Sequence, residues 1–172
     1  MRYRWKSAAI GPTPPAPEGF SFRDAAADEA TRVTEIAILA YASDPTWQEM
    51  MPGIRIRMTG RIAQNLGQAG SRFVVAVAPS GELAGCSGVV VDHPSGQNFL
   101  TGICVLPEYQ RRGVGRRLLW ESLSRLHELG VPHPLVYTEL GSIADSFIYP
   151  LFSSSREEGV VYPAVSLGET SQ

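Results

Sequence analysis

The chain has 172 residues, which is enough for one compact domain with a substantial core, and this length favours one domain over two. Its formal net charge of −2 and pI near 5.9 give no overall basic character, so nucleic acid is a poor candidate for the main partner. Its apolar runs are far shorter than the ~20 residues that span a bilayer, and no continuous apolar signal core opens it, so we expect a cytoplasmic protein without a membrane partner.

The cysteines and histidines give no sign of a disulfide framework or a metal site. Cys86 and Cys104 lie inside apolar, strand-like runs, which predicts buried thiols in a reducing compartment. Together with His93, His127 and His133 they show no ligand spacing, so no metal is expected.

The first eighteen residues are rich in proline and hold few groups that could form a core. Pro12, Pro14, Pro15 and Pro17 all fall within this stretch. The composition predicts a flexible or extended leader over residues 1–18, followed by a single domain over residues 19–172.

A short strand and a helix open the expected domain. Residues 20–23 are typical of a strand, and Asp24 or Asp28 can cap the helix that follows. Apolar side chains share one helical face between residues 30 and 40, and the helix is expected to stop before Asp44, which precedes a proline.

A second helix is predicted from Ile54 to about Leu66, because apolar residues recur there at every fourth position. The connector before this helix carries Trp47, Met50 and Met51, which makes it unusually apolar. These side chains can simply cover the edge of the core.

Three consecutive antiparallel strands are expected next. Residues 73–78 and 83–91 are typical of strands and are joined by a Pro-Ser-Gly-Glu turn. A second turn over residues 92–96 returns the chain into a strand from Phe99 to Val105. Pro107 should end that strand, because proline has no N–H to donate to a ladder.

Residues Gln110 to Gly115, with the sequence QRRGVG, join this strand to a predicted helix. Leucines at helical spacing support that helix: Leu119, Leu123 and Leu126. The first N–H groups of a helix have no partner inside it, and glycines let a phosphate approach them closely. Further positive charge comes from Arg111, Arg112, Arg116 and Arg117. The pattern favours an anionic ligand with a diphosphate; the alternative is a glycine-containing turn beside a solvated basic face.

Two common phosphate motifs are excluded at this loop. The Lys-Ser/Thr pair of a Walker loop is absent, and so is the third glycine of the dinucleotide fingerprint. Nucleotide hydrolysis and hydride transfer therefore become poor candidates for the activity.

The remaining elements are expected to be a strand over residues 135–140, a helix from Ser142 to Phe152 and a final strand over residues 160–167. The order βααβββαβαβ has no internal repeat and indicates an α+β or mixed-sheet fold.

The QRRGVG stretch resembles the acyl-CoA-binding motif of the GCN5-related N-acetyltransferase (GNAT) superfamily, in which Gln/Arg-x-x-Gly-x-Gly/Ala follows a strand ending Val-x-Pro. The matching residues here are Val105 to Pro107 and Gln110 to Gly115. The resemblance implies a mixed α/β, or α+β, fold with a central, mostly antiparallel mixed sheet, splayed strands and flanking helices. It also implies that the connector before residue 54 lines the acceptor pocket.

The resemblance further implies that acetyl-CoA, or another acyl-CoA, is the co-substrate. The residues expected to bind it are Ile103, Cys104, Val105, Gln110, Arg111, Arg112, Gly113, Val114, Gly115, Arg116 and Ser142. The pantetheine arm would lie beside the strand that ends at Val105, and a backbone N–H there would polarise the thioester carbonyl.

The general base is not given by the family pattern. A free alkylamine has a pKa of about 10, so some group must take a proton before attack. Several members use a Glu or His on the strand before the loop, but Phe99 and Thr101 hold the corresponding positions here. Glu139 is our catalytic candidate; Asp92 and His93 are the others, and both also suit a solvated turn.

Tyr149 is expected to be the general acid that protonates the departing thiolate. Many members have Asn-x-x-Ala-x-x-Leu-Tyr followed by a Gly-Phe pair, and Ser142 lies where the Asn would be. Residues 150–154 do not contain the Gly-Phe pair, and Pro150 should end or kink the helix. The alternative is a packed tyrosine at the helix end.

These residues predict an enzyme that moves an acetyl, or other short acyl, group from acyl-CoA to a primary amine of a small molecule. Two alternatives remain: a CoA-binding module without turnover, and acyl transfer from a carrier protein. The exposed last strand could pair with its own copy, so a homodimer is possible.

Overall fold

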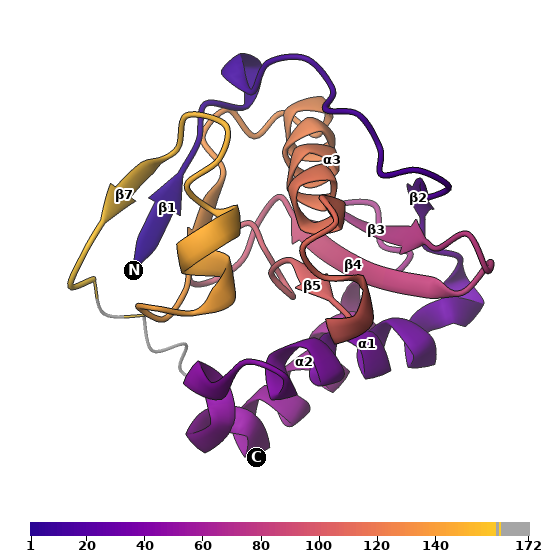
Figure 1. The fold of residues 1–172 in the computed structure, drawn as a ribbon. Helices are drawn as coiled ribbons and strands as arrows, with labels where there is room; N and C mark the ends of the chain where they lie inside the picture. The colour runs from indigo at the N-terminus through magenta and orange to yellow at the C-terminus, as the bar shows by residue number, and fades with distance from the viewer. Residues whose placement is uncertain (161, 163–172) are drawn as a thin grey trace.

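The computed structural model describes residues 1–160 and 162 (Figure 1). The strands are Arg2–Arg4 (β1), Ser21–Asp24 (β2), Ser71–Val77 (β3), Leu83–Val90 (β4), Cys104–Val105 (β5), Leu135–Tyr137 (β6) and Ser155–Glu157 (β7). The α-helices are Ala30–Ala42 (α1), Met51–Asn65 (α2) and Val114–Glu128 (α3).

The strands form two antiparallel sheets. One sheet has the order β2-β3-β4-β5, and the other has the order β6-β1-β7. β5 pairs with β4 over only two positions, Gly85 with Val105 and Cys86 with Cys104, and it is an edge strand. β5 and β6 belong to different sheets, as expected for splayed strands.

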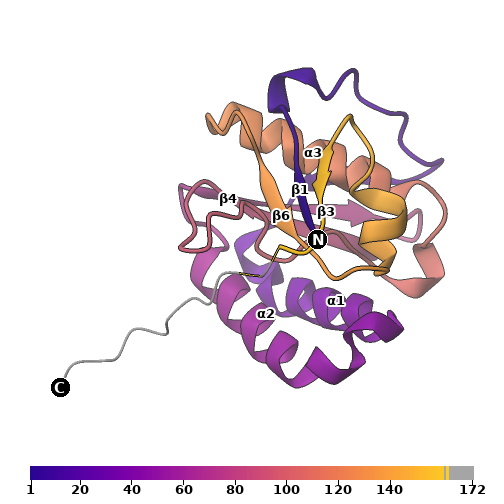
Figure 2. The same cartoon turned by 90° about the vertical axis from the view of Figure 1, so that its left-hand side faces the viewer.

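Helices cover both faces of the four-stranded sheet. α1 and α2 lie against one face, and α3 lies on the other face and reaches the second sheet (Figures 1 and 2). The apolar stripes predicted for these helices are buried: Val33 and Ile36 of α1, Ile54 and Ile62 of α2, and Leu119 of α3. The mixed α/β architecture predicted from the sequence is therefore confirmed.

The prediction of a flexible leader is wrong for the first ten residues. β1 lies between β6 and β7 in the second sheet, and Tyr3 and Trp5 are each only 1% exposed. The prolines that suggested a leader follow this strand, where the chain runs in an extended path past α3, with Pro14 accepting a hydrogen bond from Arg117 (3.0 Å). Burial of these two aromatic side chains stabilises the segment in the fold, although prolines follow it closely in the sequence.

The predicted strand from Phe99 to Val105 is largely broken. Only Cys104 and Val105 form ladder pairs, while Phe99 makes an isolated bridge to Val89. Gly102 adopts a φ of 71°, which a strand residue cannot have, so the segment bends away from β4 before β5 begins.

The C-terminal elements also differ from prediction. The helix expected over residues 142–152 is a single π-helical turn, Ala144–Ile148, and the chain then passes through two residues with positive φ, Phe152 and Ser153. β7 follows at Ser155–Glu157. The final strand expected over residues 160–167 lies outside the described residues except at 160 and 162, so pairing of two copies through it stays a prediction.

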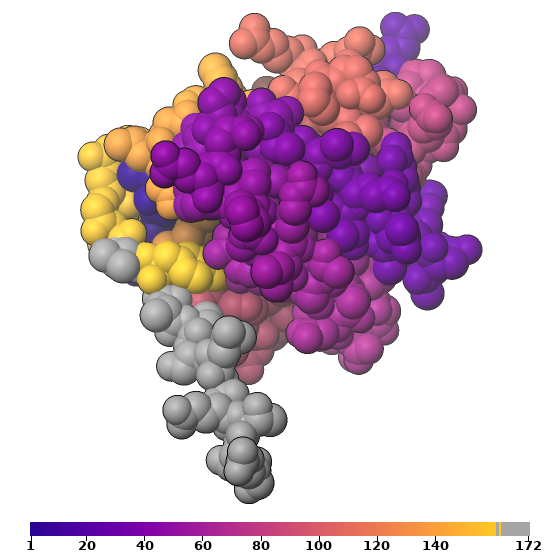
Figure 3. All heavy atoms as spheres, turned by 90° about the horizontal axis from the view of Figure 1, so that it is seen from below, coloured from indigo at the N-terminus to yellow at the C-terminus, as the bar shows by residue number. Residues whose placement is uncertain are grey.

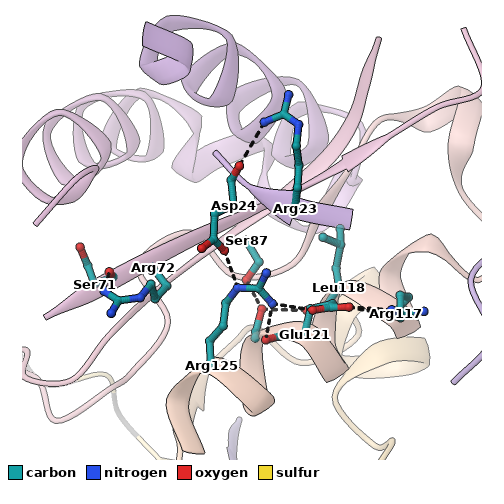
Figure 4. A network of polar contacts seen from close by, with 10 residues as sticks. Arg23, Asp24, Ser71, Arg72, Ser87, Arg117, Leu118, Glu121 and Arg125 are labelled. Carbon is teal, nitrogen blue, oxygen red and sulfur yellow. Dashed lines mark hydrogen bonds and ion pairs between the residues drawn. The ribbon is translucent and has the colours of Figure 1, made fainter. Parts of the chain in front are cut away.

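The 3-10 turn that leads into α1, Ala27–Glu29, is held by Glu29 instead of an aspartate. Its carboxylate accepts a hydrogen bond from the Ala26 N–H (2.7 Å) and pairs with Arg23. Asp24 instead pairs with Arg125 of α3, which also contacts Glu121 (Figure 4). This polar network joins β2 to the outer face of α3.

None of the helices in the described part of the chain combines the length and apolar character needed to cross a bilayer. Within residues 1–160 and 162, no three His, Cys, Asp or Glu side chains are grouped so that they could hold a metal ion.

Candidate active site

The loop between β5 and α3 is shaped by a proline, a glutamine and a glycine. Pro107 opens a short 3-10 helix that ends at Tyr109, and the Gln110 side chain donates to the Val105 carbonyl (3.0 Å). Gly113 then takes a φ of 86° immediately before α3, a conformation that side chains with a Cβ rarely adopt. The glycine at this position is therefore required by the turn.

The first turn of α3 presents unused hydrogen-bond donors. The earliest bond into the helix runs from the Arg117 N–H to the Gly113 carbonyl (3.1 Å). The N–H groups of Val114, Gly115 and Arg116 have no acceptor among the described residues. These donors, together with the positive end of the helix dipole, form an anion-binding corner.

The four arginines near this corner point in different directions. Arg111 and Arg116 line the adjoining cavity, whereas Arg112 lies over the Tyr109 ring, 5.9 Å from its centroid. Arg117 turns to the far side of α3 and pairs with Glu121 (2.8 Å). Two of the four arginines therefore line the cavity, and the guanidinium of one of them, Arg116, lies over the Phe152 ring, 5.8 Å from its centroid.

A cavity of about 600 Å³ lies between β5, the start of α3 and the π-helical turn. Eight of the residues predicted to bind acyl-CoA line it: Ile103, Cys104, Val105, Gln110, Arg111, Gly113, Gly115 and Arg116. Tyr149 lines it as well. Arg112, Val114 and Ser142 do not; Val114 is 1% exposed and packs into the core.

Val105 turns a backbone donor toward this cavity. The neighbouring N–H, that of Leu106, donates to the Ala84 carbonyl of β4 (2.9 Å). Successive N–H groups of a strand point to opposite sides, and β5 is an edge strand, so the Val105 N–H points away from β4. A donor is thus placed where the resemblance implied one.

Tyr149 sits at the inner end of the cavity with its hydroxyl buried. The ring is 3% exposed and packs against Tyr3 and Trp5, with ring centroids 5.7 and 5.9 Å away. The hydroxyl oxygen accepts a hydrogen bond from the Ile103 N–H (3.4 Å), and its own hydrogen has no acceptor among the described residues. Burial raises the pKa of Tyr149 well above its usual value, so the hydroxyl keeps its proton at neutral pH.

A second tyrosine hydroxyl, from α1, lies near the same glycine as the first. Tyr41 donates to the Thr101 carbonyl (2.8 Å), and burial raises its pKa well above the usual value. A Cβ at Gly102 would lie 2.9 Å from the Tyr149 hydroxyl and 3.1 Å from that of Tyr41. The absence of a Cβ at Gly102 therefore leaves room for both hydroxyls.

Sequence reasoning missed Asp44 as a cavity residue. Asp44 is 5% exposed, and its carboxylate accepts hydrogen bonds from the N–H groups of Thr46 (3.0 Å) and Ile143 (2.8 Å). It thereby ties the end of α1 to the segment before the π-helical turn. The only signal in the sequence was its place as an N-cap before Pro45, which does not indicate a distant partner.

Ser142 does not reach the cavity. It is fully buried, its hydroxyl contacts that of Thr138 (2.9 Å), and it accepts from the Asp145 N–H (3.1 Å). Its place is at the start of the π-helical turn that carries Tyr149, so it positions that turn.

The base candidates are placed apart from one another. Glu139 is exposed and lines a second cavity, of about 310 Å³, that shares Tyr41, Trp47, Tyr137 and Thr138 with the first. His93 lines neither cavity; its Nδ1 contacts the Ser95 hydroxyl (2.7 Å), and burial, with Arg61 nearby, lowers its pKa. Asp92 is exposed in the same turn. Glu139 alone among them faces a cavity.

The comparisons with known proteins identify the family. Residues 32–144 match the model of the acetyltransferase (GNAT) family. The chain belongs to this family. The match covers the loop of QRRGVG, α3 and the wall formed by α1.

Solved structures with the same fold include a GCN5-related N-acetyltransferase from Kribbella flavida, at 15% identity and a TM-score of 0.53 over 84% of this chain and 48% of that one. A second, from Sphaerobacter thermophilus, has 20% identity and a TM-score of 0.51 over 81% of this chain and 42% of that one. A Pyrococcus furiosus protein has 16% identity and a TM-score of 0.53 over 74% and 87%.

The chain thus spans less than half the length of the Kribbella and Sphaerobacter proteins. No curated protein matches it.

Proposed function

We propose that this GNAT-family chain is an acyl-CoA-dependent N-acetyltransferase that moves an acetyl, or another short acyl, group to a primary amine of a small molecule. The observation that carries the proposal is that one cavity joins the free N–H groups of α3 to the buried hydroxyl of Tyr149. An anion-binding corner and a proton donor are therefore at two ends of the same space.

The residues around the first cavity fit the co-substrate. The N–H groups of Gly115 and Arg116, with the guanidinium of Arg111, suit a diphosphate. The apolar wall along Ile103 to Val105 suits a pantetheine arm. When bound, acyl-CoA supplies the activated thioester.

Tyr149 is the proposed general acid. Its pKa is raised by burial, so it holds a proton that it can donate to a departing thiolate, while the Ile103 N–H stabilises the oxygen that loses it. The proposed role of the Val105 N–H is to stabilise negative charge on the thioester carbonyl oxygen.

Glu139 is the proposed proton acceptor for the amine. It lines the second cavity, which shares four lining residues with the first, among them Tyr41 and Tyr137. An exposed carboxylate in contact with solvent can pass the proton on to water.

The first experiment measures thermal unfolding with acetyl-CoA and with pantetheine, which lacks the diphosphate. A ligand at 100 times its Kd that binds only the folded state adds about 2.7 kcal/mol of stability. We expect a clear rise in Tm with acetyl-CoA and little with pantetheine, and loss of that rise in the double variant Arg111→Gln, Arg116→Gln. CoA release with a panel of primary amines then tests transfer.

The alternatives give different results in the same experiment. A rise in Tm without CoA release from any amine would support a CoA-binding module that has lost turnover. No rise with free acetyl-CoA would contradict the proposal and favour a carrier-protein donor.

A further inference from the structure

The second cavity lies between α2 and the segments that end at Gly102 and begin at Val136. Figure 3 shows α2, in purple, on the same face as the orange and yellow C-terminal segments. Its wall is mixed: polar groups expose about as much surface as the aromatic and methionine side chains, which are Tyr41, Trp47, Met50, Met58, Phe99 and Tyr137. Its volume of about 310 Å³ is at the small end for ligand sites, so it suits a small molecule.

Two arginines of α2 and the N-terminal ammonium of Met1, which donates to the Thr138 carbonyl (2.8 Å), provide the positive charge in this wall. Arg57 and Arg61 are four residues apart, so they lie on one face of the helix. Within the described residues, no carboxylate is within ion-pair distance of either guanidinium. Glu139 is the one acidic side chain among the described residues of the wall.

Arg61 is held in place by neutral groups. It donates to the Leu100 carbonyl (3.0 Å) and to the Tyr162 hydroxyl (3.0 Å), and Tyr162 also accepts from Gln97 (2.7 Å). A guanidinium has five N–H donors, so most of them remain for a ligand. The guanidinium is thereby oriented without its charge being neutralised.

The charges of Arg57 and Arg61 act on Tyr41, which lines both cavities. Burial, with Cys104 and Tyr149, raises the pKa of Tyr41, and Arg61 and Arg57 oppose that rise. Two guanidinium groups without a carboxylate partner in the described structure favour an acceptor that carries negative charge over a polycation such as a polyamine.

We propose that the acceptor is an amino acid with an apolar or aromatic side chain, whose carboxylate binds Arg57 and Arg61 while its amine points toward Tyr149. This inference rests on the proposed acetyltransferase function. The aromatic and methionine side chains of the wall would contact the acceptor's side chain. The guanidinium groups of Arg57 and Arg61 would donate hydrogen bonds to its carboxylate.

The test compares acceptors that differ only in the carboxylate. CoA release is measured with a panel of apolar and aromatic amino acids and with the corresponding amino acid amides. We expect at least a tenfold higher kcat/KM for the best amino acid than for its amide. Equal or better turnover of the amides, with the acetyl-CoA response intact, would overturn the inference and leave the proposed function standing.

Variants of α2 then locate the effect. Arg57→Gln and Arg61→Gln should each lower kcat/KM for the amino acid about tenfold and change that for the amide less than twofold. The control is Arg55→Gln, because Arg55 is exposed on the same helix and lines neither cavity. An equal loss for both acceptors would contradict carboxylate recognition.

A binding measurement keeps the inference testable without turnover. Trp47 lines both cavities, so its fluorescence can report binding of an N-acetyl amino acid and of its amide. Tighter binding of the acid, lost in Arg57→Gln and Arg61→Gln, would support carboxylate recognition even if no CoA were released, an outcome that would count against the proposed function alone. Equal binding, or no binding of either compound, would overturn the inference.

Discussion

Tyr149 combines two properties that suit a proton donor. Its ring is fixed by aromatic neighbours, and its hydroxyl oxygen receives one N–H, from Ile103, while the hydroxyl hydrogen has no acceptor in the described structure. The raised pKa means that an alkaline loss of activity should not come from this group until well above pH 10.

Replacing the hydroxyl tests this assignment. Tyr149→Phe keeps the ring, so we expect the Tm and the Kd for acetyl-CoA to change little. The kcat should fall on the order of 10²-fold or more, as is typical when a general acid is removed. Steady-state kinetics and thermal unfolding check both expectations.

Tyr41→Phe is the matched control. The Tyr41 proton already bonds to the Thr101 carbonyl, so its removal should cost much less kcat than removal of the Tyr149 hydroxyl. If both variants lost activity equally, or if Tyr149→Phe stayed fully active, Tyr149 would be a packing residue, which is the alternative reading of a tyrosine at this position.

At the scale of single residues, the sequence predicted the loop that opens α3 but not the residues that the two cavities share. The loop from Gln110 to Gly115 is shaped by local backbone geometry, which a motif encodes. Tyr41 reaches the site through its contact with Thr101, which is 60 positions away in the sequence. Asp44 reaches it through Ile143, which is 99 positions away. No local pattern carries such contacts.

Among the elements, the start of α3 is where backbone and ligand are expected to approach most closely. A Cβ on Gly115 would meet the Cδ1 of Ile148 at 2.8 Å, the far end of a flexible side chain. That side chain and Gly115 both line the first cavity. Gly113 is a poorer test position, because its φ of 86° strains any substitution.

Gly115→Ala should therefore weaken acetyl-CoA binding about tenfold with little change in stability. Alanine favours a helix over glycine by about 1 kcal/mol, which offsets the displacement of Ile148. Isothermal titration and thermal unfolding measure the two effects.

The control for this variant is Gly60→Ala in α2, where a Cβ meets nothing within 4 Å. It should raise stability and leave the Kd for acetyl-CoA unchanged. Unchanged affinity in Gly115→Ala would contradict the placement of a diphosphate at the α3 N-terminus.

Elements with a long repeat were predictable, and short ones were not. α2 and α3 have fifteen residues each and show their apolar stripe over several turns. β1 and β7 have three residues each, too few to show alternation, and they pair although they are far apart in the sequence. Such strands form because of tertiary contacts, and the strand propensities of single residues do not describe those contacts.

Across the whole molecule, the second sheet supports the π-helical turn beneath Tyr149. Asp145, 5% exposed, accepts from the Tyr3 hydroxyl of β1 (2.7 Å) and from the Gly141 N–H (2.8 Å), and Arg156 of the β7 segment lies 3.5 Å away. Residues of β1, of β7 and of the segment just before the turn therefore meet at one carboxylate.

These contacts set the direction of the Asp145 pKa. Burial raises it, but the hydrogen bonds from Gly141 and Tyr3 and the charge of Arg156 outweigh burial, and the net pKa is lowered from 3.8. For Tyr3, burial and the bond to Asp145 raise the pKa to about 12, so it remains a donor.

A carboxylate with a lowered folded pKa adds stability above its unfolded pKa and loses that contribution as the pH falls through the folded pKa. Asp145→Asn should therefore lower the free energy of unfolding by about 1–3 kcal/mol at pH 7, because a charged acceptor is replaced by a neutral one. The difference between the two proteins should shrink as the pH falls below about 4.

Urea unfolding at several pH values between 7 and 3 measures this difference, and Asp92→Asn, at an exposed turn position, is the control that should show none. A constant difference at every pH would mean that Asp145 acts through shape and not through charge. The turn that carries Tyr149 depends on β1 for its position, and Asp145 makes the contact between them. If the prediction holds, loss of the charge should therefore also lower kcat, because Tyr149 would be displaced.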